Sequence, residues 1–331
     1  MRLAGSNVLV TGGAGFIGSH LVDALAGLKC RVRVLDDLSN GREENLGLHF
    51  GDRRFKFMKG NVCDPADVAR AMEGVDAVFH LATLGVRHSI GHPFLNHRVN
   101  AEGTLLVLEE ARRAAVKKFI YCSSSEVYGT ARYVPMNEEH PTNPCTVYGA
   151  GKLAGEAYAR AYWLTYGLKT VIIRPFNTFG PRSHHEGDSG EMIPKSIVRS
   201  LAGEPVLIFG DGLQTRDFTF VEDTAAGLVE AARCDGLEGG TFNMGNGSER
   251  TILDVARTVI RLAGDGRSRI KFLKGRPGDV LRLYAGSEAF RKKTGWKPSV
   301  SFAEGLKKTI RWFKSRGEIR VLMNEEKGAN W

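Results

Sequence analysis

The stretch Thr11-Gly-Gly-Ala-Gly-Phe-Ile-Gly18 lies between the short apolar run Asn7–Val10 and the amphipathic run Ser19–Leu28. The first run is typical of a buried strand and the second of a helix. The glycines at positions 12, 13, 15 and 18 fit the patterns Gly-x-Gly-x-x-Gly and Gly-x-x-Gly-x-x-Gly. Between a strand and a helix, such a turn lets backbone amides and the helix N-terminus hold a pyrophosphate. The stretch therefore predicts a dinucleotide site at the first strand.

Strand and helix signals alternate through the first half of the chain. The predicted strands are Asn7–Val10, Arg31–Leu35, Phe55–Met58, Ala77–Leu81, Lys118–Tyr121 and Thr170–Ile173. The predicted helices are Ser19–Leu28, Pro65–Met72, Ala101–Ala115 and Ala150–Tyr166. This alternation predicts an α/β protein with a Rossmann-type, doubly wound parallel sheet.

The regular alternation of strand and helix signals ends after Pro175. Residues 180–190 are rich in Gly, His and Ser and are expected to form a loop, and shorter helical and extended pieces follow without regular alternation. We therefore expect a dinucleotide-binding domain at 1–178 plus about 218–245, and a smaller substrate-binding domain at 179–217 and 246–331. The polar tail Val321–Trp331 is expected to fray.

Composition places the chain among soluble globular proteins, with 331 residues, 42% hydrophobic and 25% charged. No apolar run approaches the roughly 20 residues that span a bilayer, and the N-terminus leads straight into a strand without room for a secretory signal. The cysteines are odd in number and scattered, without metal-ligand spacing: Cys30, Cys63, Cys122, Cys145 and Cys234. They indicate free thiols, a cytoplasmic location and no structural metal.

The net charge of +9 raises the question of a nucleic-acid partner. Lys and Arg are spread along the chain, and no basic run alternates with aromatic residues. Two interpretations remain: a solvated basic surface, or a positive field that attracts an anionic, phosphate-bearing small molecule. We favour the second, because the glycine turn already requires an anionic ligand.

Asp36 follows the second predicted strand, about 20 residues beyond the glycine turn, where an acid hydrogen-bonds the ribose hydroxyls of NAD. A carboxylate there repels a 2′-phosphate and so favours NAD over NADP. Arg42 lies just beyond and could hold such a phosphate.

A second motif, Tyr148-Gly-Ala-Gly-Lys152, places a phenol and an ammonium four residues apart on one face of a helix. A cation near a phenol favours the phenolate, so Lys152 and a positively charged nicotinamide would make Tyr148 a general base for a sugar hydroxyl. Alone, the motif is common on helix surfaces. Combined with the dinucleotide turn, it indicates alcohol–ketone redox chemistry.

These residues resemble the extended short-chain dehydrogenase/reductase family, and within it the nucleotide-sugar epimerases, dehydratases and decarboxylases. The resemblance spans roughly residues 6–315. It rests also on Asp36-Asp-Leu-Ser-Asn40, His80-Leu-Ala82, Asn100-x-x-Gly-Thr104, Ser123-Ser-Ser-Glu-Val-Tyr-Gly129, Arg174-Pro-Phe-Asn177, Gly180-Pro-Arg182, Arg216-Asp217 and Arg276-Pro-Gly-Asp279.

The resemblance implies a seven-stranded sheet, a small C-terminal domain that grips a nucleoside-diphosphate sugar, and NAD as cofactor. The residues that it implies for cofactor binding are Gly12, Gly15, Phe16, Ile17, Gly18, Asp36, Asn40, Asn61, Val62, Leu81, Ala82, Asn100, Tyr148 and Lys152. Those implied for the substrate, most simply a UDP-sugar, are Arg87, Ser125, Asn177, Arg216, Arg276 and Asp279. Each substrate residue could instead be a helix cap or a surface ion pair.

Ser124 matches the family's Ser or Thr that hydrogen-bonds the reacting oxygen, and Glu126 separates two enzyme hypotheses. The segment Ser124-Ser125-Glu126 aligns with acid-containing segments of dehydratases and decarboxylases, in which a carboxylate near the C5 carbon of the sugar would remove its proton. Typical 4-epimerases lack that acid. The alternative interpretation, that Glu126 only pairs with a nearby cation, carries close to equal weight.

Other segments resemble short 4-epimerases, including those acting on hexuronates, notably Leu84-Gly-Val-Arg-His-Ser89. Arg87, Arg182, His184 and His185 could approach a substrate carboxylate, although a solvated loop is the simpler reading for the two histidines. We place a UDP-sugar 4-epimerase slightly ahead of a 4,6-dehydratase or UDP-glucuronate decarboxylase, and a non-catalytic NAD-binding scaffold last.

The resemblance also implies a homodimer. Close relatives pair through a four-helix bundle, and the matching helices here are Ala101–Ala115 and Ala150–Tyr166. No membrane or nucleic-acid partner is expected.

Overall fold

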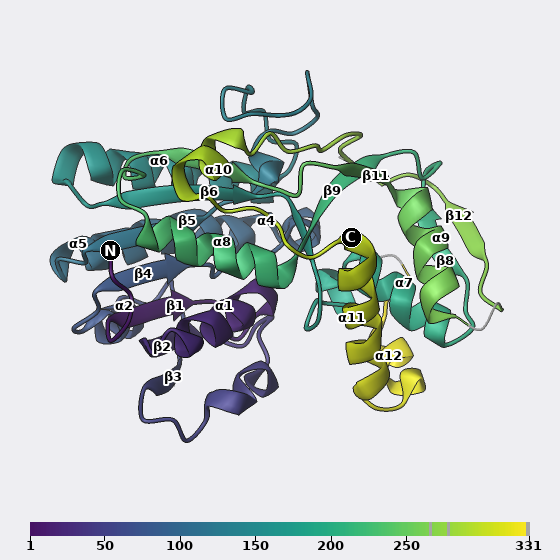
Figure 1. Ribbon diagram of the computed structural model, residues 1–331, viewed down its shortest axis with the longest axis horizontal. Helices are drawn as coiled ribbons and strands as arrows, with labels where there is room; N and C mark the ends of the chain where they lie inside the picture. Colours follow the sequence, from purple (N-terminus) through teal and green to yellow (C-terminus); the bar gives the residue numbers. More distant parts are fainter. Residues whose placement is uncertain (265–266, 277–278, 329–331) are drawn as a thin grey trace.

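The computed structural model describes residues 1–264, 267–276 and 279–328. Its largest unit is a seven-stranded sheet in the order β10-β6-β5-β4-β1-β2-β3, in which every pair of neighbours is parallel (Figure 1). The strands are β1 (Asn7–Thr11), β2 (Arg31–Asp36), β3 (Phe55–Lys59), β4 (Ala77–His80), β5 (Lys118–Cys122), β6 (Thr170–Pro175) and β10 (Thr241–Met244). The predicted doubly wound parallel sheet is confirmed.

Helices cover both faces of this sheet, as parallel strands require. Two helices, α1 (Phe16–Gly27) and α8 (Val221–Arg233), pack together on the face that is in front in Figure 1. The opposite face carries α2 (Pro65–Met72), α5 (Thr104–Arg113) and α6 (Val147–Tyr166). Shorter helical segments lie between β1 and α6: η1 (Glu43–His49), α3 (Val86–Gly91), α4 (Pro93–His97), the π-helical η2 (Arg98–Gly103) and η3 (Ser125–Val127).

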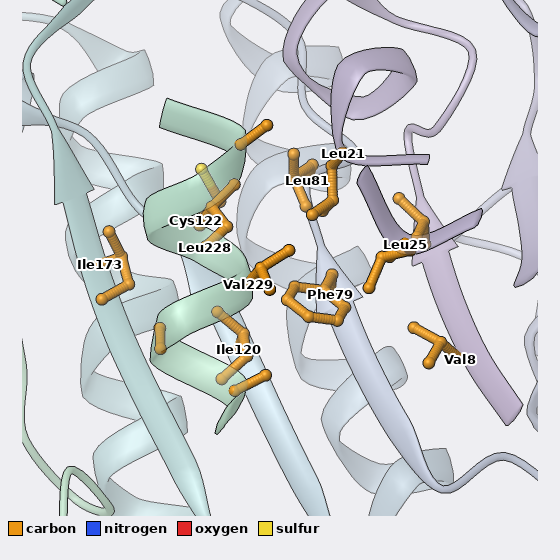
Figure 2. Close-up of a cluster of buried hydrophobic side chains, with 14 of the residues drawn as sticks. Val8, Leu21, Leu25, Phe79, Leu81, Ile120, Cys122, Ile173, Leu228 and Val229 are labelled. Carbon is orange, nitrogen blue, oxygen red and sulfur yellow. The ribbon is translucent and has the colours of Figure 1, made fainter. Parts of the chain in front are cut away.

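Successive residues of the central strands enter two separate hydrophobic cores, because side chains alternate across a sheet. Val8, Phe79 and Ile120 pack with Leu25 and other residues of α1 and α8 in the core of Figure 2. The residues beside them in sequence, such as Val78 and Phe119, pack in the core on the α5 and α6 side. Strands buried on both faces read as continuous apolar runs, which is why their sequence signal was strong.

Most of the remaining elements form a smaller unit with its own core, at the right of Figure 1. Its two small sheets are β11-β9-β7 and β12-β8. The strands are β7 (Asn177–Phe179), β8 (Val206–Phe209), β9 (Thr215–Phe220), β11 (Glu249–Thr251) and β12 (Ile270–Leu273). Besides α8, the helical elements that follow β7 are η4 (Gly187–Ser189), α7 (Met192–Leu201), α9 (Ile252–Ala263), α10 (Glu288–Thr294), α11 (Phe302–Ser315) and α12 (Ile319–Glu325). Helix α10 packs on β10 of the large sheet. The exact division into two domains stays a prediction.

The order of strands reverses beside β1, whose neighbours are β2 on one side and β4 on the other. The chain winds outward from β1 to β3, and then returns to place β4, β5 and β6 on the other side. At such a switch point the connections diverge and leave a crevice at the carboxyl ends of the strands.

The expected fraying of the tail is wrong for the part that the structure describes. Residues 319–325 form α12, and the Glu326 carboxylate, only 2% exposed, pairs with Lys195 at 3.2 Å and with Arg199 at 2.5 Å. Two buried cations on α7 thus hold the polar segment against the protein. Residues 329–331 lie outside the described residues.

The helix predicted at residues 150–166 begins three residues earlier. The Thr146 hydroxyl accepts a hydrogen bond from the Gly149 amide at 3.1 Å and so caps α6. The glycines at 149 and 151 hid this start, because glycine lowers helix propensity. The helix predicted at 101–115 likewise begins three residues earlier, since η2 precedes α5 without a break, but it ends at Arg113.

We predict that Gly18→Ala destabilises the protein and that Gly27→Ala does not. A Cβ at Gly18 would lie 2.1 Å from the Gly12 carbonyl oxygen, whereas one at Gly27, in the same helix, meets nothing within 4 Å. Overpacking of this kind costs about 1–3 kcal/mol, while alanine at Gly27 gains helix propensity. Thermal unfolding of both variants measures the difference, and equal melting temperatures would contradict the prediction.

Candidate active site

A cavity of about 420 Å³ lies at the carboxyl ends of β1, β2, β4, β5 and β6, and residues of the smaller unit close its other side. Most residues singled out in the sequence line it. They are Gly12, Gly15, Phe16, Ile17, Gly18, Asp36, Asn40, Val62, Leu81, Ala82, Arg87, Ser124, Ser125, Glu126, Tyr148, Lys152, Asn177, Arg216, Arg276 and Asp279. Parallel pairing brings these distant segments to one edge of the sheet.

The glycine turn forms one wall of the cavity. Gly12 has φ of +69°, and a Cβ there would lie 2.7 Å from the Ala82 backbone nitrogen. The α1 helix begins after Gly15, so no capping side chain occupies the amides of its first turn, which lines the cavity. Exposed helix-terminal amides and backbone too close for any Cβ are the features that a dinucleotide pyrophosphate requires. The residues present therefore fit NAD.

Asp36 stands at the end of β2, next to this wall. Its carboxylate accepts hydrogen bonds from the backbone amides of Ala14 and Leu38, both at 2.9 Å. Burial raises the pKa of this carboxyl, and the two amide hydrogen bonds oppose the shift. Each oxygen retains acceptor capacity for a ribose hydroxyl. Arg42, the candidate for a 2′-phosphate, lies within 3.5 Å of the Glu186 carboxylate and 3.6 Å of Glu325.

Two predicted cofactor residues are not among those that line the cavity. Asn100 is buried, and its side chain bonds Thr83, Leu84 and Asn96 at 2.9 to 3.0 Å. It therefore supports the loop after β4, which does line the cavity. The Asn61 side chain accepts from the Cys63 amide at 2.8 Å and donates to Asp37 at 3.2 Å. Contacts of these two residues with the cofactor stay predictions.

Tyr148 and Lys152 lie on the first turns of α6, facing the end of β5. Burial raises the pKa of the Tyr148 phenol above its usual value, and the nearby Ser124 hydroxyl opposes the rise. The Lys152 ammonium donates to the Cys122 carbonyl at 2.9 Å and lies 6.0 Å from the Tyr148 ring centre. Burial lowers the pKa of Lys152 to about 8. The structure thus brings Ser124, Tyr148 and Lys152 together, as predicted.

Glu126 lies in η3 with its side chain toward a group of arginines. Burial raises the pKa of its carboxyl, while Arg216, Arg87 and Arg276 favour the charged form and Asp279 opposes it. This carboxyl therefore sits inside the cavity wall rather than on the surface. Both earlier interpretations, a base and a partner for cations, are compatible with this position.

The predicted substrate residues of the smaller unit form a basic wall opposite the glycine turn. Arg216 pairs with Asp279 at 2.9 Å, and Asp279 also accepts from Gln214 at 3.3 Å. The Arg276 guanidinium lies 5.2 Å from the centre of the Phe209 ring. Pro277 and Gly278, between Arg276 and Asp279 in the sequence, lie outside the described residues.

Two further polar groups in the cavity wall lack partners within the described part of the chain. Burial, together with the nearby Arg276, lowers the pKa of Arg87 to about 10. The Arg87 Nε atom and the Asn177 Oδ1 atom are both buried without a hydrogen-bond partner there. Unsatisfied buried polar atoms are rare in proteins and indicate a place for a polar ligand.

The two histidines of the loop at 180–190 do not lie in a solvated segment, which was the simpler interpretation of the sequence. His185 is buried, and His184 lines the cavity and lies 2.9 Å from Glu186. Arg182 turns away from the cavity and pairs with Asp23 of α1 at 2.8 Å. Sequence reasoning did not single out Glu191, whose carboxyl lines the cavity with its pKa raised by burial. The sequence signal that could have pointed to Glu191 is its position just before α7, as the N-cap residue of that helix.

Within the described residues, no group of three or more His, Cys, Asp and Glu side chains could hold a metal ion. All five cysteines are free thiols. A search of the described helices finds none long and apolar enough to cross a membrane.

Comparisons with known proteins agree with this geometry. The chain is 38% identical over 314 residues to a UDP-glucose 4-epimerase of Mycolicibacterium smegmatis, covering 94% of this chain and 99% of that protein. An epimerase of Methanothermobacter thermautotrophicus has a similar structure, with a TM-score of 0.92, 33% identity and coverage of 98% and 96%. A dTDP-glucose 4,6-dehydratase of Streptomyces venezuelae, solved with NAD bound, gives a TM-score of 0.88, 33% identity and coverage of 94% and 97%.

The model of the NAD dependent epimerase/dehydratase family matches residues 8–245, which include the glycine turn, Ser124, Tyr148 and Lys152. The match spans well over half of the chain and agrees with the extended short-chain dehydrogenase/reductase resemblance seen in the sequence. The chain belongs to this family of NAD-dependent enzymes that modify nucleotide sugars.

Proposed function

We propose that this enzyme is a UDP-sugar 4-epimerase, with Ser124, Tyr148 and Lys152 as its catalytic residues. The observation that carries the proposal is that Ser124, Tyr148 and Lys152 line the same cavity as the glycine turn, with the Lys152 ammonium 6.0 Å from the Tyr148 ring centre. The similarity to a UDP-glucose 4-epimerase over nearly the full length of both chains supports the same activity.

The chemistry assigned to these residues is proton transfer at the C4 hydroxyl of the sugar. NAD, when bound at the glycine turn, would supply the acceptor for the C4 hydride and its donor in the reverse step. Tyr148 takes the hydroxyl proton during oxidation and gives it back during reduction, while Ser124 hydrogen-bonds the same oxygen. Lys152 stabilises the phenolate by its charge and anchors the nicotinamide ribose.

The basic wall fits a nucleoside diphosphate. Arg216 and Arg276 line the cavity on the side away from the glycine turn, and Asp279, which also accepts a hydrogen bond from Gln214, holds Arg216 in place. Guanidinium groups match phosphate oxygens in geometry as well as charge. The positive net charge of the chain acts in the same direction, since it attracts an anionic substrate.

The alternative is a 4,6-dehydratase or a UDP-glucuronate decarboxylase, which would begin with the same C4 oxidation. The observation in its favour is Glu126, a carboxyl in the cavity wall whose pKa is raised by burial. A raised pKa strengthens a carboxylate as a base. A non-catalytic NAD-binding scaffold is disfavoured, because it has no need of the Ser124, Tyr148 and Lys152 arrangement.

The proposed assembly is a homodimer in the cytoplasm. Helices α5 and α6 pack side by side on one face of the sheet, and Ala150, Ala157 and Ala161 are exposed along α6. Small residues permit close approach of a second pair of helices, which supports a four-helix bundle. The five free cysteines support a reducing compartment.

The function is tested by incubating the purified protein with a panel of nucleotide sugars and identifying products by NMR. A 4-epimer is the expected product, and a 4-keto-6-deoxy sugar or a pentose would identify the alternatives.

Tyr148→Phe should bind substrate nearly as well as the wild type but lose about 10²–10⁴-fold in kcat, because proton transfer alone is removed. Near-wild-type turnover by Tyr148→Phe would exclude Tyr148 as the base that takes the C4 hydroxyl proton.

Glu126→Gln separates epimerisation from dehydration. An epimerase never removes the C5 proton, so kcat should change by less than about tenfold, the effect of a lost hydrogen bond. A dehydratase would stall after oxidation, with NADH absorbance accumulating. Turnover in deuterated water gives an independent measurement: C5 deuterium in a 6-deoxy-4-keto product would overturn the epimerase proposal, and a missing C6 would identify a decarboxylase.

Ala157→Arg is expected to convert the dimer into a monomer, since a long charged side chain in the middle of α6 would block the helix bundle. The matched variant Ala69→Arg, at an exposed alanine of α2, should leave the dimer intact. Light scattering at micromolar concentration distinguishes the 36.3 kDa chain from its dimer. A monomeric wild type would contradict the proposed assembly.

A further inference from the structure

Helix α6 carries a third buried polar residue in line with its two proposed catalytic residues. Tyr148, Lys152 and Glu156 are spaced four residues apart, so they lie along one face of the helix. Glu156 is only 5% exposed. A carboxylate is rarely buried unless it is paired and hydrogen-bonded, and its partners lead to the catalytic segment after β5.

The Glu156 carboxylate joins that segment to the neighbouring strand. One oxygen, Oε1, accepts from the Ser123 hydroxyl at 2.5 Å and from the Arg174 Nε atom at 2.8 Å. The other, Oε2, accepts from Arg174 Nη2 at 2.6 Å. Glu156 and Arg174 thus form a bidentate ion pair with both side chains buried. This pairing fixes the carboxylate and the guanidinium in one geometry.

Arg174 extends the same network to the far side of the catalytic segment. Its Nη1 atom donates to the Tyr128 hydroxyl at 2.7 Å, and that hydroxyl donates to the Asn243 side chain at 2.7 Å. Ser123 and Tyr128 are therefore both held through the Glu156–Arg174 pair. Between them lie Ser124, Ser125 and Glu126, the residues that face the cavity.

Glu156 also lies close enough to Lys152 to act on its charge. Burial lowers the pKa of Lys152, and Cys122 and then Glu156 oppose that shift. The other titratable groups that face Lys152 are neutral near pH 7. Burial raises the pKa of Cys122 to about 11 and lowers that of His80 to about 3, and it raises the pKa of both nearby phenols, Tyr121 and Tyr148. Arg174, which pairs with Glu156, is positively charged, so the negative charge near the Lys152 ammonium comes from Glu156.

We propose that Glu156 is a positioning residue of the catalytic centre: with Arg174 it fixes both flanks of the Ser124–Glu126 segment, and its charge keeps Lys152 protonated. The inference rests on the proposed roles of Ser124, Tyr148 and Lys152. Glu156 itself touches neither substrate nor cofactor in this arrangement and acts through Ser123, Arg174 and Lys152.

The charge role is measured without substrate, by NMR titration of protein labelled with ¹³C at the lysine Cε atom. The Lys152 signal is assigned by its absence in Lys152→Arg. In Glu156→Gln, Lys152 should lose its proton at lower pH than in the wild type, because the neighbouring negative charge is gone. Glu156→Asp keeps a carboxylate and should restore much of the shift. An unchanged Lys152 midpoint in Glu156→Gln would overturn the charge role.

A matched control lies at the opposite end of β5. There the buried Lys118 ammonium, 2% exposed, pairs with Glu238 at 2.9 Å. Glu238→Gln removes a carboxylate from a buried cation, as Glu156→Gln does, but far from the cavity. It should lower the melting temperature while leaving the Lys152 midpoint and kcat unchanged. If Glu238→Gln altered both as much as Glu156→Gln, the effect would be general destabilisation and the proposal would be wrong.

The positioning role is measured by kinetics. Glu156→Gln should lower kcat about 10²-fold, as a small displacement of reacting groups does, with little change in KM, and Glu156→Asp should fall between. Wild-type kcat in Glu156→Gln would overturn this role. If Glu156→Gln does not fold, Glu156→Gln/Arg174→Gln replaces it, because it leaves no unpaired buried charge. Should the wild type convert no nucleotide sugar, the proposed function fails, while the Lys152 titration still decides the inference.

Discussion

Parallel pairing of β1, β4, β5 and β6 is the constraint on which the rest of the structure depends. Because the strands run in one direction, the residue that follows each strand lies at the same edge of the sheet. Gly12, Leu81, Ser123 and the Pro175 end of β6 are far apart in sequence but become neighbours there. The strands are apolar and buried on both faces, so the polar residues needed for chemistry gather where the strands end.

The charge distribution in the cavity depends on whether a wall is formed by the sheet edge or by the smaller unit. The sheet edge contributes backbone amides, hydroxyls and a phenol, whereas the smaller unit contributes arginines held by acidic partners. Buried arginines without a ligand are unfavourable unless carboxylates lie close by. Glu126, Glu191 and Asp279 meet that need, since all three carboxylates favour the charged form of Arg87. A diphosphate would enter a site whose cations are already fixed in place.

The parts of this arrangement that the sequence predicts are those encoded by local pattern. The glycine turn, the six strands up to Thr170 and the Tyr148–Lys152 pair all follow from periodicity or spacing over a few residues. Asn100 shows the limit of that reasoning, because three of its four hydrogen bonds join Thr83 and Leu84, in a loop whose path the pattern does not specify, and the fourth joins Asn96 of α4. Glu156 shows the same limit: its partners, Ser123 and Arg174, lie on two other elements. Burial of a polar residue depends on tertiary structure, and spacing alone does not encode it.

The ion pairs that link the C-terminal segment to the loop at 180–190 bear on the order of folding. Glu325 lies within 3.1 Å of His185 and 3.6 Å of Arg42, and Glu326 pairs with two cations of α7. These contacts close very long loops in the chain, and such contacts form late because loop closure must be compensated by other interactions first. The sheet, built largely from strands that follow one another, can form earlier. The C-terminal segment therefore completes the wall beside the loop at 180–190 through contacts of much larger sequence separation than most strand pairs of the sheet.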